Sequence, residues 1–420
     1  MTQRSSDTVE VLADLDYLEQ PSRMGWLRHQ AGRSGGIFSF EYDPEWLKKP
    51  ESFTFDPDLA LVHGPQYPAS DRQNFGIFLD SSPDRWGRVL MQRRENMCAR
   101  RERRKARSLT EWDFLLGVHD ETRMGALRFR DAKTGRFLDS EDAFAAPPIA
   151  SLRELQAASL SFEAHADEEE HPDYRRWLTQ LFAPGTSLGG ARPKASVRDE
   201  KGFLCLAKFP SRQDRRDVGA WEVVACRLAA LAGIRLPQAR AMRIPGTAYT
   251  TFIARRFDRT PQDRRLPFVS AMTLTQRKDG ESGASYLELV DLLQSQGSRT
   301  REDCAELFRR VVFSILIHNT DDHLRNHGFF LGRRGISLSP AYDLNPSIER
   351  EELTLAINEA DTTCDVEIAL DAHASYGLSK VEAQKIVKKT AAAAALWRRE
   401  AKRLGIPESE QDLMAAAFER

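Results

Sequence analysis

The sequence predicts an α+β protein with a small β-rich lobe and a large helical lobe, preceded by an N-terminal α/β subdomain. Three observations predict this fold class. A glycine-rich segment at 185–194 leads into short apolar runs that are typical of strands. The chain beyond residue 285 shows mostly helical spacing of its apolar residues, and a polar, glycine-containing stretch at 318–343 interrupts that spacing. We expect the boundaries to fall at 1–148, 149–280 and 281–420.

Composition narrows the class of protein before any motif is considered. The 420 residues carry a formal net charge of −1, so charge alone indicates neither a nucleic-acid binder nor an acidic tail. The five cysteines are scattered without a CxxC pair, which disfavours a disulfide framework or a zinc site and fits a reducing cytosol. The start lacks the features of a signal peptide, and no apolar run reaches membrane-spanning length. We therefore expect a cytoplasmic protein without membrane contact.

The N-terminal range alternates as a strand over 36–42 and then turns helical. A helix containing Val89–Met91 has Ser81, Ser82 and Asp84 as candidate caps, and a second helix begins at Ser108 or Thr110. A basic run at 93–107 could contact phosphate. A solvated helical face is favoured, because the whole chain is nearly neutral.

The middle range offers candidate nucleotide contacts in a defined order. The glycines of 185–194 would let backbone N–H groups approach an anion, although the segment lacks the Walker pattern and an ordinary turn remains an alternative. Lys208 lies in an apolar strand, where a lysine is costly unless an anion pairs with it. Glu222 opens a helical pattern; it either steadies Lys208 or is a first-turn carboxylate favoured by the helix dipole. The run 250–259 would form the hinge over which an adenine lies.

The stretch 318–343 carries the strongest motif. Asp321 is followed after four residues by Asn326, and Asp343 comes later, which is the order found in protein kinases. In that apparatus the first Asp orients the acceptor hydroxyl as base, while the Asn and the second Asp hold Mg²⁺. Asp322 competes for the role of base, but only Asp321 has the right gap, so we expect Asp322 to be a solvated or substrate-facing neighbour. Together these elements predict a bilobal protein-kinase-like fold with the ATP site in the small lobe, followed by one C-terminal helix over 381–404.

The sequence resembles the HipA family of bacterial serine/threonine kinases, the toxin halves of type II toxin–antitoxin modules. The resemblance rests on TSLGGARPK, LAKFP, RRFDR, NTDDHLRN and SPAYDLNPS, and on the N-terminal segments FSFEYDPEWL, FLDSSPDRWGR and LTEWDFLLGVHDETRMGALRFR. It implies ATP and Mg²⁺ as cofactors and Asp321 as catalytic base, with Asn326 and Asp343 as metal ligands. It also implies autophosphorylation at Ser187 or the adjacent Thr186. The nucleotide contacts that follow from the resemblance and the motifs are Ser187, Gly189, Gly190, Ala191, Lys194, Lys208, Glu222, Arg256, Phe257, His323, Asn326 and Asp343.

The resemblance further implies a HipB-like helix-turn-helix antitoxin as partner, DNA contact only through that antitoxin, and a protein substrate such as an aminoacyl-tRNA synthetase. Two alternatives stay open. An aminoglycoside-type phosphotransferase shares the D-x4-N loop but usually has a histidine two residues before the Asp, where this chain has Asn319. The second is a chain that acts mainly as an antitoxin-binding co-repressor, a role that can coexist with protein-kinase activity. The sequence names neither the substrate nor the oligomeric state.

Overall fold

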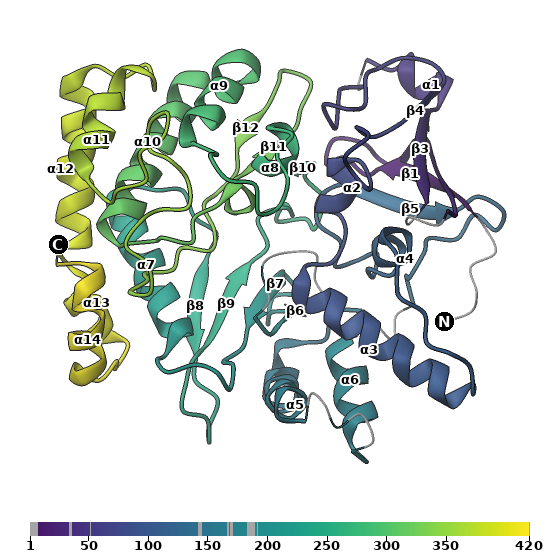
Figure 1. Cartoon of the computed structure of the whole chain (residues 1–420), viewed down its shortest axis with the longest axis horizontal. Coiled ribbons are helices and arrows are strands. Elements are labelled where there is room, and N and C mark those ends of the chain that lie inside the picture. The colour runs from purple at the N-terminus through teal and green to yellow at the C-terminus, as the bar shows by residue number, and fades with distance from the viewer. Residues whose placement is uncertain are drawn as a thin grey trace. The chain divides into compact units, whose positions relative to one another are not determined.

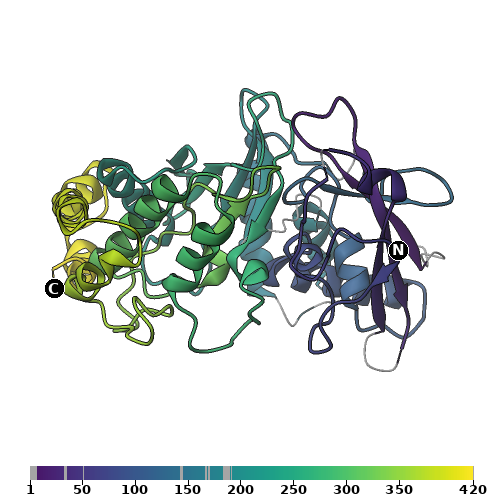
Figure 2. The ribbon, with the colours of Figure 1, turned by 90° about the horizontal axis from the view of Figure 1, so that it is seen from above.

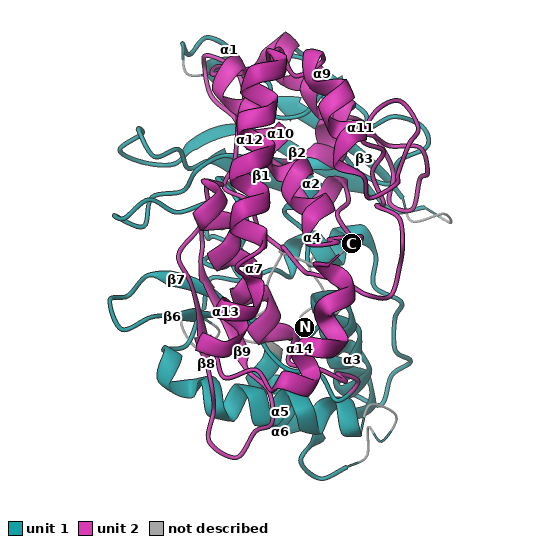
Figure 3. Ribbon diagram, turned by 90° about the vertical axis from the view of Figure 1, so that its left-hand side faces the viewer, with its two compact units in different colours: residues 1–212, 258–269 teal, residues 213–257, 270–420 magenta. Residues whose placement is uncertain are grey.

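The computed structural model describes residues 7–32, 36–50, 52–141, 145–165, 168, 171–182, 190 and 192–419. The chain forms two compact units (Figure 3): unit 1 comprises residues 1–212 and 258–269, and unit 2 comprises residues 213–257 and 270–420. These limits do not coincide with the predicted boundaries at 148 and 280, so the three-part division stays a prediction. Each unit contains both helices and strands, and the predicted α+β class is confirmed.

Unit 1 begins with a five-stranded antiparallel sheet in the order β4-β3-β2-β1-β5, drawn in purple to blue in Figure 2. The expected strand is β3 (Ile37–Tyr42), in which Phe38, Phe40 and Tyr42 point into the core and alternate with more exposed residues. This alternation is the period of two that a sheet with one buried face requires. The other elements of this region are β1 (Thr8–Ala13), β2 (Ser22–Gln30), α1 (Pro44–Leu47), β4 (Pro65–Gln66), α2 (Gly76–Asp80) and β5 (Leu127–Asp131).

Between residues 85 and 182, the elements of unit 1 are mainly helices (Figure 1). Asp84 caps α3 (Arg85–Arg101) by accepting a hydrogen bond from the Gly87 N–H, and Thr110 caps α4 (Glu111–Leu116) with a full capping box. Both caps were among the candidates from the sequence. Helix α3 packs on α5 (Leu152–Ala164) and α6 (Tyr174–Phe182), with the one-turn helix η2 (Ile149–Ser151) before α5. Their shared core contains Trp86, Leu90, Ala158, Phe162, Tyr174, Trp177, Leu178 and Leu181.

Unit 1 also contains the antiparallel pair β6 (Lys194–Arg198) and β7 (Leu204–Lys208), followed much later by residues 258–269. Buried polar contacts hold this late segment. The Asp258 carboxylate accepts from the Gly125 N–H at 2.9 Å, the Arg259 guanidinium donates to the Arg123 carbonyl at 2.9 Å, and Arg265 donates to the Asp120 carbonyl at 2.6 Å. The segment after the predicted hinge is therefore built into the N-terminal part of the chain.

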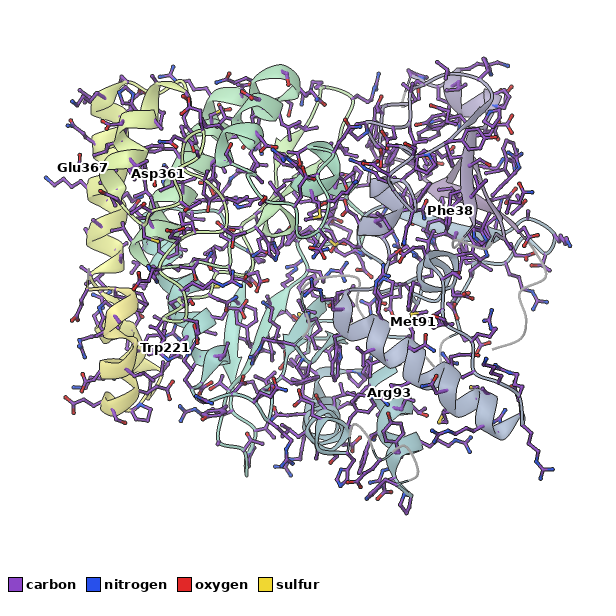
Figure 4. The ribbon with its side chains drawn as sticks, in the orientation of Figure 1. Phe38, Met91, Arg93, Trp221, Asp361 and Glu367 are labelled. Atoms are coloured by element: carbon purple, nitrogen blue, oxygen red, sulfur yellow. The ribbon has the colours of Figure 1, made fainter. Side chains whose placement is uncertain are left out.

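Unit 2 is mainly helical. Helix α7 (Val218–Ala232) ends at Gly233 in the left-handed conformation, which a glycine adopts without a Cβ penalty. It is buried against the C-terminal helices, where Trp221, labelled in Figure 4, packs near Trp397 and Phe418. The remaining elements are β8 (Ala239–Met242), β9 (Thr251–Arg255), β10 (Phe268–Ser270, which begins in unit 1), α8 (Ala271–Leu274), α9 (Tyr286–Gln296), α10 (Thr300–Leu316), η3 (Leu324–Asn326), β11 (Gly328–Phe330), β12 (Ser337–Leu338), α11 (Val366–Asp371), η4 (Ala372–Ala374), α12 (Lys380–Ala394), α13 (Trp397–Arg403), α14 (Glu408–Met414) and η5 (Ala415–Ala417).

The prediction of a single helix over 381–404 is wrong. The chain forms α12 and α13, separated at Ala395 and Leu396. At the break the Leu396 N–H donates to the Ala393 carbonyl at 3.1 Å. This bond spans three residues instead of the four of an α-helix, so the turn is tighter. The bend leaves Trp397 buried and stacked on Phe418, with ring centroids 4.8 Å apart. Tertiary packing thus overrides a uniformly helical alanine-rich sequence. Across the described ranges, no helix combines the length and apolarity needed to cross a membrane.

Candidate active site

The loop that carries Asp321 starts just after α10 and is fixed by a buried histidine. His318 is 1% exposed and has a φ of 54°, a left-handed conformation. Its two ring nitrogens lie 3.0 Å from the Ser347 carbonyl oxygen and 3.2 Å from that of Glu351. The Ser347 N–H in turn donates to the His318 carbonyl at 3.1 Å. One side chain therefore ties the start of the loop to the segment 347–351.

The next two residues extend this attachment. The Asn319 side-chain oxygen accepts from the Asn345 N–H at 3.2 Å. The Thr320 carbonyl accepts from the N–H and the hydroxyl of Thr354, at 3.1 and 2.8 Å. Since buried backbone groups need partners, each contact restricts where the loop can lie. The loop is thus held from several sides before it reaches Asp321.

Asp322 is buried, which corrects the expectation of a solvated or substrate-facing neighbour. It accepts hydrogen bonds from the Tyr286 hydroxyl at 2.7 Å and the Ser314 hydroxyl at 3.1 Å, and its other oxygen lies 3.0 Å from His327 Nε2. Burial raises the pKa of the Asp322 carboxyl, but the charge and hydrogen bonds of these partners outweigh burial, so the pKa lies below its ordinary value. Asp322 is therefore an ionised, buried residue whose contacts fix the loop.

Asp321 has the opposite environment. Its side chain is 74% exposed, and its carboxylate lies 3.6 Å from the guanidinium of Arg350, which is itself 62% exposed. Such an exposed pair contributes little and can be displaced by a ligand. Behind it, the Asn326 amide donates to the Asp321 carbonyl at 3.2 Å, and the Asn326 N–H donates to the His323 carbonyl at 2.8 Å. The carboxylate is therefore accessible while its backbone is fixed.

Asp343 occupies a constrained position. Its φ of 60° is left-handed, which Asp tolerates better than most residues, and its Oδ1 accepts from the Asn345 amide at 2.8 Å. The Asn326 amide donates through nitrogen, so its oxygen points elsewhere. An amide oxygen and a carboxylate are the hard ligands that Mg²⁺ prefers. The donor set of Asn326 and Asp343 thus fits this metal.

An aromatic contact connects the predicted hinge to the same loop. The Phe257 ring stacks on Tyr342 with centroids 5.2 Å apart, and it meets Phe330 edge-on at 6.1 Å. The Tyr342 hydroxyl donates to the Arg325 carbonyl at 2.6 Å. Since Tyr342 directly precedes Asp343, the hinge residue, the Asp321 loop and the second Asp form one packed group within unit 2.

The remaining predicted residues of unit 2 are Glu222, Arg256 and His323. Glu222 is the fifth residue of α7 and only 2% exposed, so the alternative of a first-turn carboxylate is not supported. Arg256 is also 2% exposed. The ring nitrogen Nδ1 of His323 is buried, and no hydrogen-bond partner for it lies among the described residues. The structure thus brings Asp321, His323 and Asn326 together with Phe257 and Asp343 through direct contacts or one connecting residue.

The predicted contacts of unit 1 are described in part. Thr186, Ser187, Gly189 and Ala191 lie outside the described residues. Half-buried Lys208 ends β7, directly opposite Lys194 in β6. The Lys194 ammonium is buried, donating to Asp84 Oδ2 and the Gly190 carbonyl at 2.8 Å each. This pairing argues against the expected contact of the Lys194 ammonium with a phosphate.

Two residues of the basic run, Arg104 and Arg107, form structural ion pairs. Arg104 binds both oxygens of the fully buried Glu95, at 2.5 and 3.1 Å, and also pairs with Glu102. The Arg107 N–H donates to Glu95 at 3.1 Å, and its guanidinium reaches Asp113 at 3.3 Å. For Arg104 and Arg107 these contacts disfavour a phosphate-binding patch, and both side chains are engaged in ion pairs rather than only solvated as expected.

The sequence analysis did not identify three features of the candidate site: Asn345, Tyr342 and the ion pair of Asp84 with Lys194. The first two lie in SPAYDLNPS, next to Asp343, so proximity to the motif was a usable signal. Asp84 could be recognised as a helix cap, but nothing in the sequence indicates a lysine 110 residues away as its partner.

Known proteins share sequence similarity with this chain. The family model described as the HipA-like C-terminal domain matches residues 186–397. Y4dM of Sinorhizobium fredii (strain NBRC 101917 / NGR234), named as a candidate kinase, is 29% identical over 218 residues, covering 47% of this chain and 53% of that protein. Toxin YjjJ of Escherichia coli (strain K12) is 27% identical over 173 residues, covering 39% of each chain. The chain thus spans about half or less of the curated relatives it matches.

A solved structure extends the comparison to the whole chain. HipA of Shewanella oneidensis MR-1, determined in a complex of HipA, HipB and operator DNA, matches with a TM-score of 0.61 at 16% identity. The match covers 98% of this chain and 95% of that one, so it shows a common fold. The predicted kinase-like α+β fold is confirmed. With a family match over half of its length and this fold, the chain belongs to the HipA-like C-terminal domain family.

Proposed function

We propose that the chain is an ATP- and Mg²⁺-dependent serine/threonine protein kinase that acts as the toxin of a type II toxin–antitoxin module. The observation that carries the proposal is the contrast at the D-x4-N loop. Asp321 is exposed on a loop fixed by His318, Asn319 and Asp322, with the oxygen ligands of Asn326 and Asp343 nearby. An exposed carboxylate on a fixed loop suits the task of orienting an acceptor hydroxyl.

The residues divide the work of phosphoryl transfer. Asp321 accepts a hydrogen bond from the hydroxyl of a Ser or Thr and takes its proton as the new O–P bond forms and the bond to ADP breaks. Asn326 and Asp343 hold Mg²⁺, which supplies charge neutralisation at the phosphates when bound. Lys208 adds positive charge at the phosphates, and Phe257 lies at the adenine side. Positioning and charge would supply most of the rate enhancement.

The comparisons support a proposal on the partner. HipA of S. oneidensis was determined with HipB and operator DNA, and the relative from E. coli is named a toxin. This supports a helix-turn-helix antitoxin as partner of the present chain, with DNA contacted through it. We further propose a translation enzyme such as an aminoacyl-tRNA synthetase as substrate, and autophosphorylation at Ser187 or Thr186 as the off-switch.

Labelled ATP tests the activity directly. Purified protein with Mg²⁺ and a cell lysate should incorporate phosphate, and mass spectrometry should locate it on Ser187 or Thr186 and on a Ser or Thr of one lysate protein. Asp321→Asn should lower incorporation by at least about 100-fold, because a positioned base contributes that much. Its melting temperature should stay unchanged, since the side chain is exposed.

Asp371→Asn is the matched control, because Asp371 is an exposed aspartate of the same unit at the end of α11. It should retain full activity. Wild-type incorporation by Asp321→Asn would refute the assignment of the base. Phosphate transfer to aminoglycosides with none to protein would replace the protein substrate by the alternative considered from the sequence.

A further inference from the structure

We propose that Asp84, far from the glycine-rich segment in sequence, is a positioning residue for nucleotide binding, because its ion pair with Lys194 anchors the end of that segment. This inference rests on the proposed kinase function. Both side chains of the pair are only 2% exposed. A buried pair of this kind is retained only where its geometry is good and its remaining bonds are satisfied.

Asp84 is itself rigidly held. One carboxylate oxygen caps α3 by accepting from the Gly87 N–H at 2.7 Å, and the other accepts from Lys194 at 2.8 Å. The first turn of α3 is fixed by the core around Trp86 and by Arg88, which forms a two-pronged pair with Glu111 at 2.5 and 2.8 Å. The carboxylate is therefore a fixed point rather than a flexible surface charge.

Lys194 transmits this position to the glycine-rich segment. Its ammonium also donates to the Gly190 carbonyl at 2.8 Å, so one cation joins Asp84 to a backbone group four residues before Lys194. The Phe209 N–H donates to the Pro193 carbonyl at 2.9 Å, which extends the β6–β7 pairing to this point. The three contacts fix where the segment enters β6.

The ion pair of Asp84 with Lys194 also reduces the repulsion between two lysines. Lys194 and Lys208 face each other across the β6–β7 pair, and like charges in that position repel. Asp84 neutralises Lys194, which lowers the repulsion between the two lysines across the β6–β7 pair. The aspartate thereby supports both the backbone and the charge that the nucleotide meets, although it need not touch the nucleotide.

The test compares Asp84→Asn with Glu111→Gln in the full-length protein. Amide hydrogen exchange without nucleotide, in peptides covering Gly190 and β6, should accelerate in Asp84→Asn and stay as in wild type in Glu111→Gln. The control also weakens the attachment of α3, through Arg88, but leaves Lys194 untouched. In kinase assays Asp84→Asn should raise KM for ATP roughly five- to tenfold with kcat nearly unchanged, the size of a typical coupling between two sites.

A double variant, Asp84→Asn with Lys194→Met, covers the case in which the single one does not fold, because it leaves no buried charge unpaired. It should show the same exchange and the same KM. Unchanged exchange in a folded Asp84 variant, or equal acceleration in Glu111→Gln, would overturn the proposal. Accelerated exchange in a protein whose wild type transfers no phosphate would establish the anchor and reject the kinase function instead.

Discussion

At the scale of residues, two neighbouring aspartates share a motif but have opposite environments. The Asp321 side chain is 74% exposed, whereas that of Asp322 is 4% exposed and surrounded by three polar partners. A carboxylate that reacts with a ligand must be reachable, and one that fixes a loop must be buried and satisfied. Of the two adjacent residues, Asp321 is therefore accessible to a ligand, and Asp322 fixes the backbone next to it.

A second buried carboxylate gives a prediction on pH. Asp56 in unit 1 accepts hydrogen bonds from the Ile77 and Asp58 N–H groups at 2.7 and 2.8 Å. Burial nevertheless raises the pKa of Asp56 from 3.8 to about 6. A raised pKa adds stability in full below about pH 4, and this stability is lost as the pH rises through 6. The shift corresponds to about 3 kcal/mol in the free energy of unfolding.

Asp56→Asn should remove this dependence, because the amide stays neutral and its oxygen can still accept a hydrogen bond. Urea unfolding between pH 4 and pH 7.5 should show the free energy of unfolding falling with pH more steeply in wild type than in the variant. Asp16→Asn, at an exposed aspartate of the same unit, should follow wild type. Parallel curves for wild type and Asp56→Asn would contradict the assignment.

At the scale of elements, features that depend on neighbouring residues could be predicted from the sequence, whereas features that depend on distant contacts could not. The caps Asp84 and Thr110 are local signals, and the structure confirms both of them. The site motif was recognisable for the same reason, since Asp321 and Asn326 lie in one short loop. The break before α13 and the burial of Asp322 depend on partners far away in sequence, which propensity and spacing do not specify.

Helix α7 offers a sharp test of element packing. A Cβ at Gly219 would lie 2.2 Å from the Thr250 carbonyl oxygen, which is too close for any real contact. Gly219→Ala should therefore lower stability by about 1–3 kcal/mol, as overpacking does, although alanine favours helices. Glu222, which the sequence offers as a partner for Lys208, lies about one turn further along α7, and in that role its displacement should lower kinase activity as well.

Thermal unfolding and phosphate transfer measure the two effects. Gly332→Ala is the matched control in the same unit, because its Cβ would come no closer than 3.6 Å to a described atom, the Gly335 carbonyl oxygen. It should change neither quantity appreciably. A Gly219→Ala protein as stable as wild type would mean that α7 can shift away from Thr250 without cost.

At the scale of the whole molecule, the compact units are not continuous in sequence. Unit 1 needs residues 258–269, and unit 2 takes up 213–257 as well as 270–420. A chain cut at the predicted boundary, starting at residue 149, would lose Gly125, Arg123 and Asp120. These residues are the partners of Asp258, Arg259 and Arg265, which are all at least nine-tenths buried.

The shortened chain should therefore fail to fold into a soluble monodisperse protein, since stranding a buried charge typically costs about 3–5 kcal/mol. Size-exclusion chromatography and thermal unfolding would show this. A chain lacking only residues 1–6 retains all three partners and should match the full chain. A well-folded 149–420 protein would show that the late segment finds other partners and that the predicted boundary is a true domain limit.

The late segment of unit 1 also sets the order in which a newly made chain can mature. The ribosome releases residues 1–212 well before residues 258–269, so the first unit emerges with Gly125, Arg123 and Asp120 still waiting for their partners. At about 5–20 residues per second, crossing from residue 213 to 269 takes roughly 3 to 11 seconds. During that interval these three residues lack their partners, so we expect synonymous codons that slow this stretch to lower the yield of folded chain.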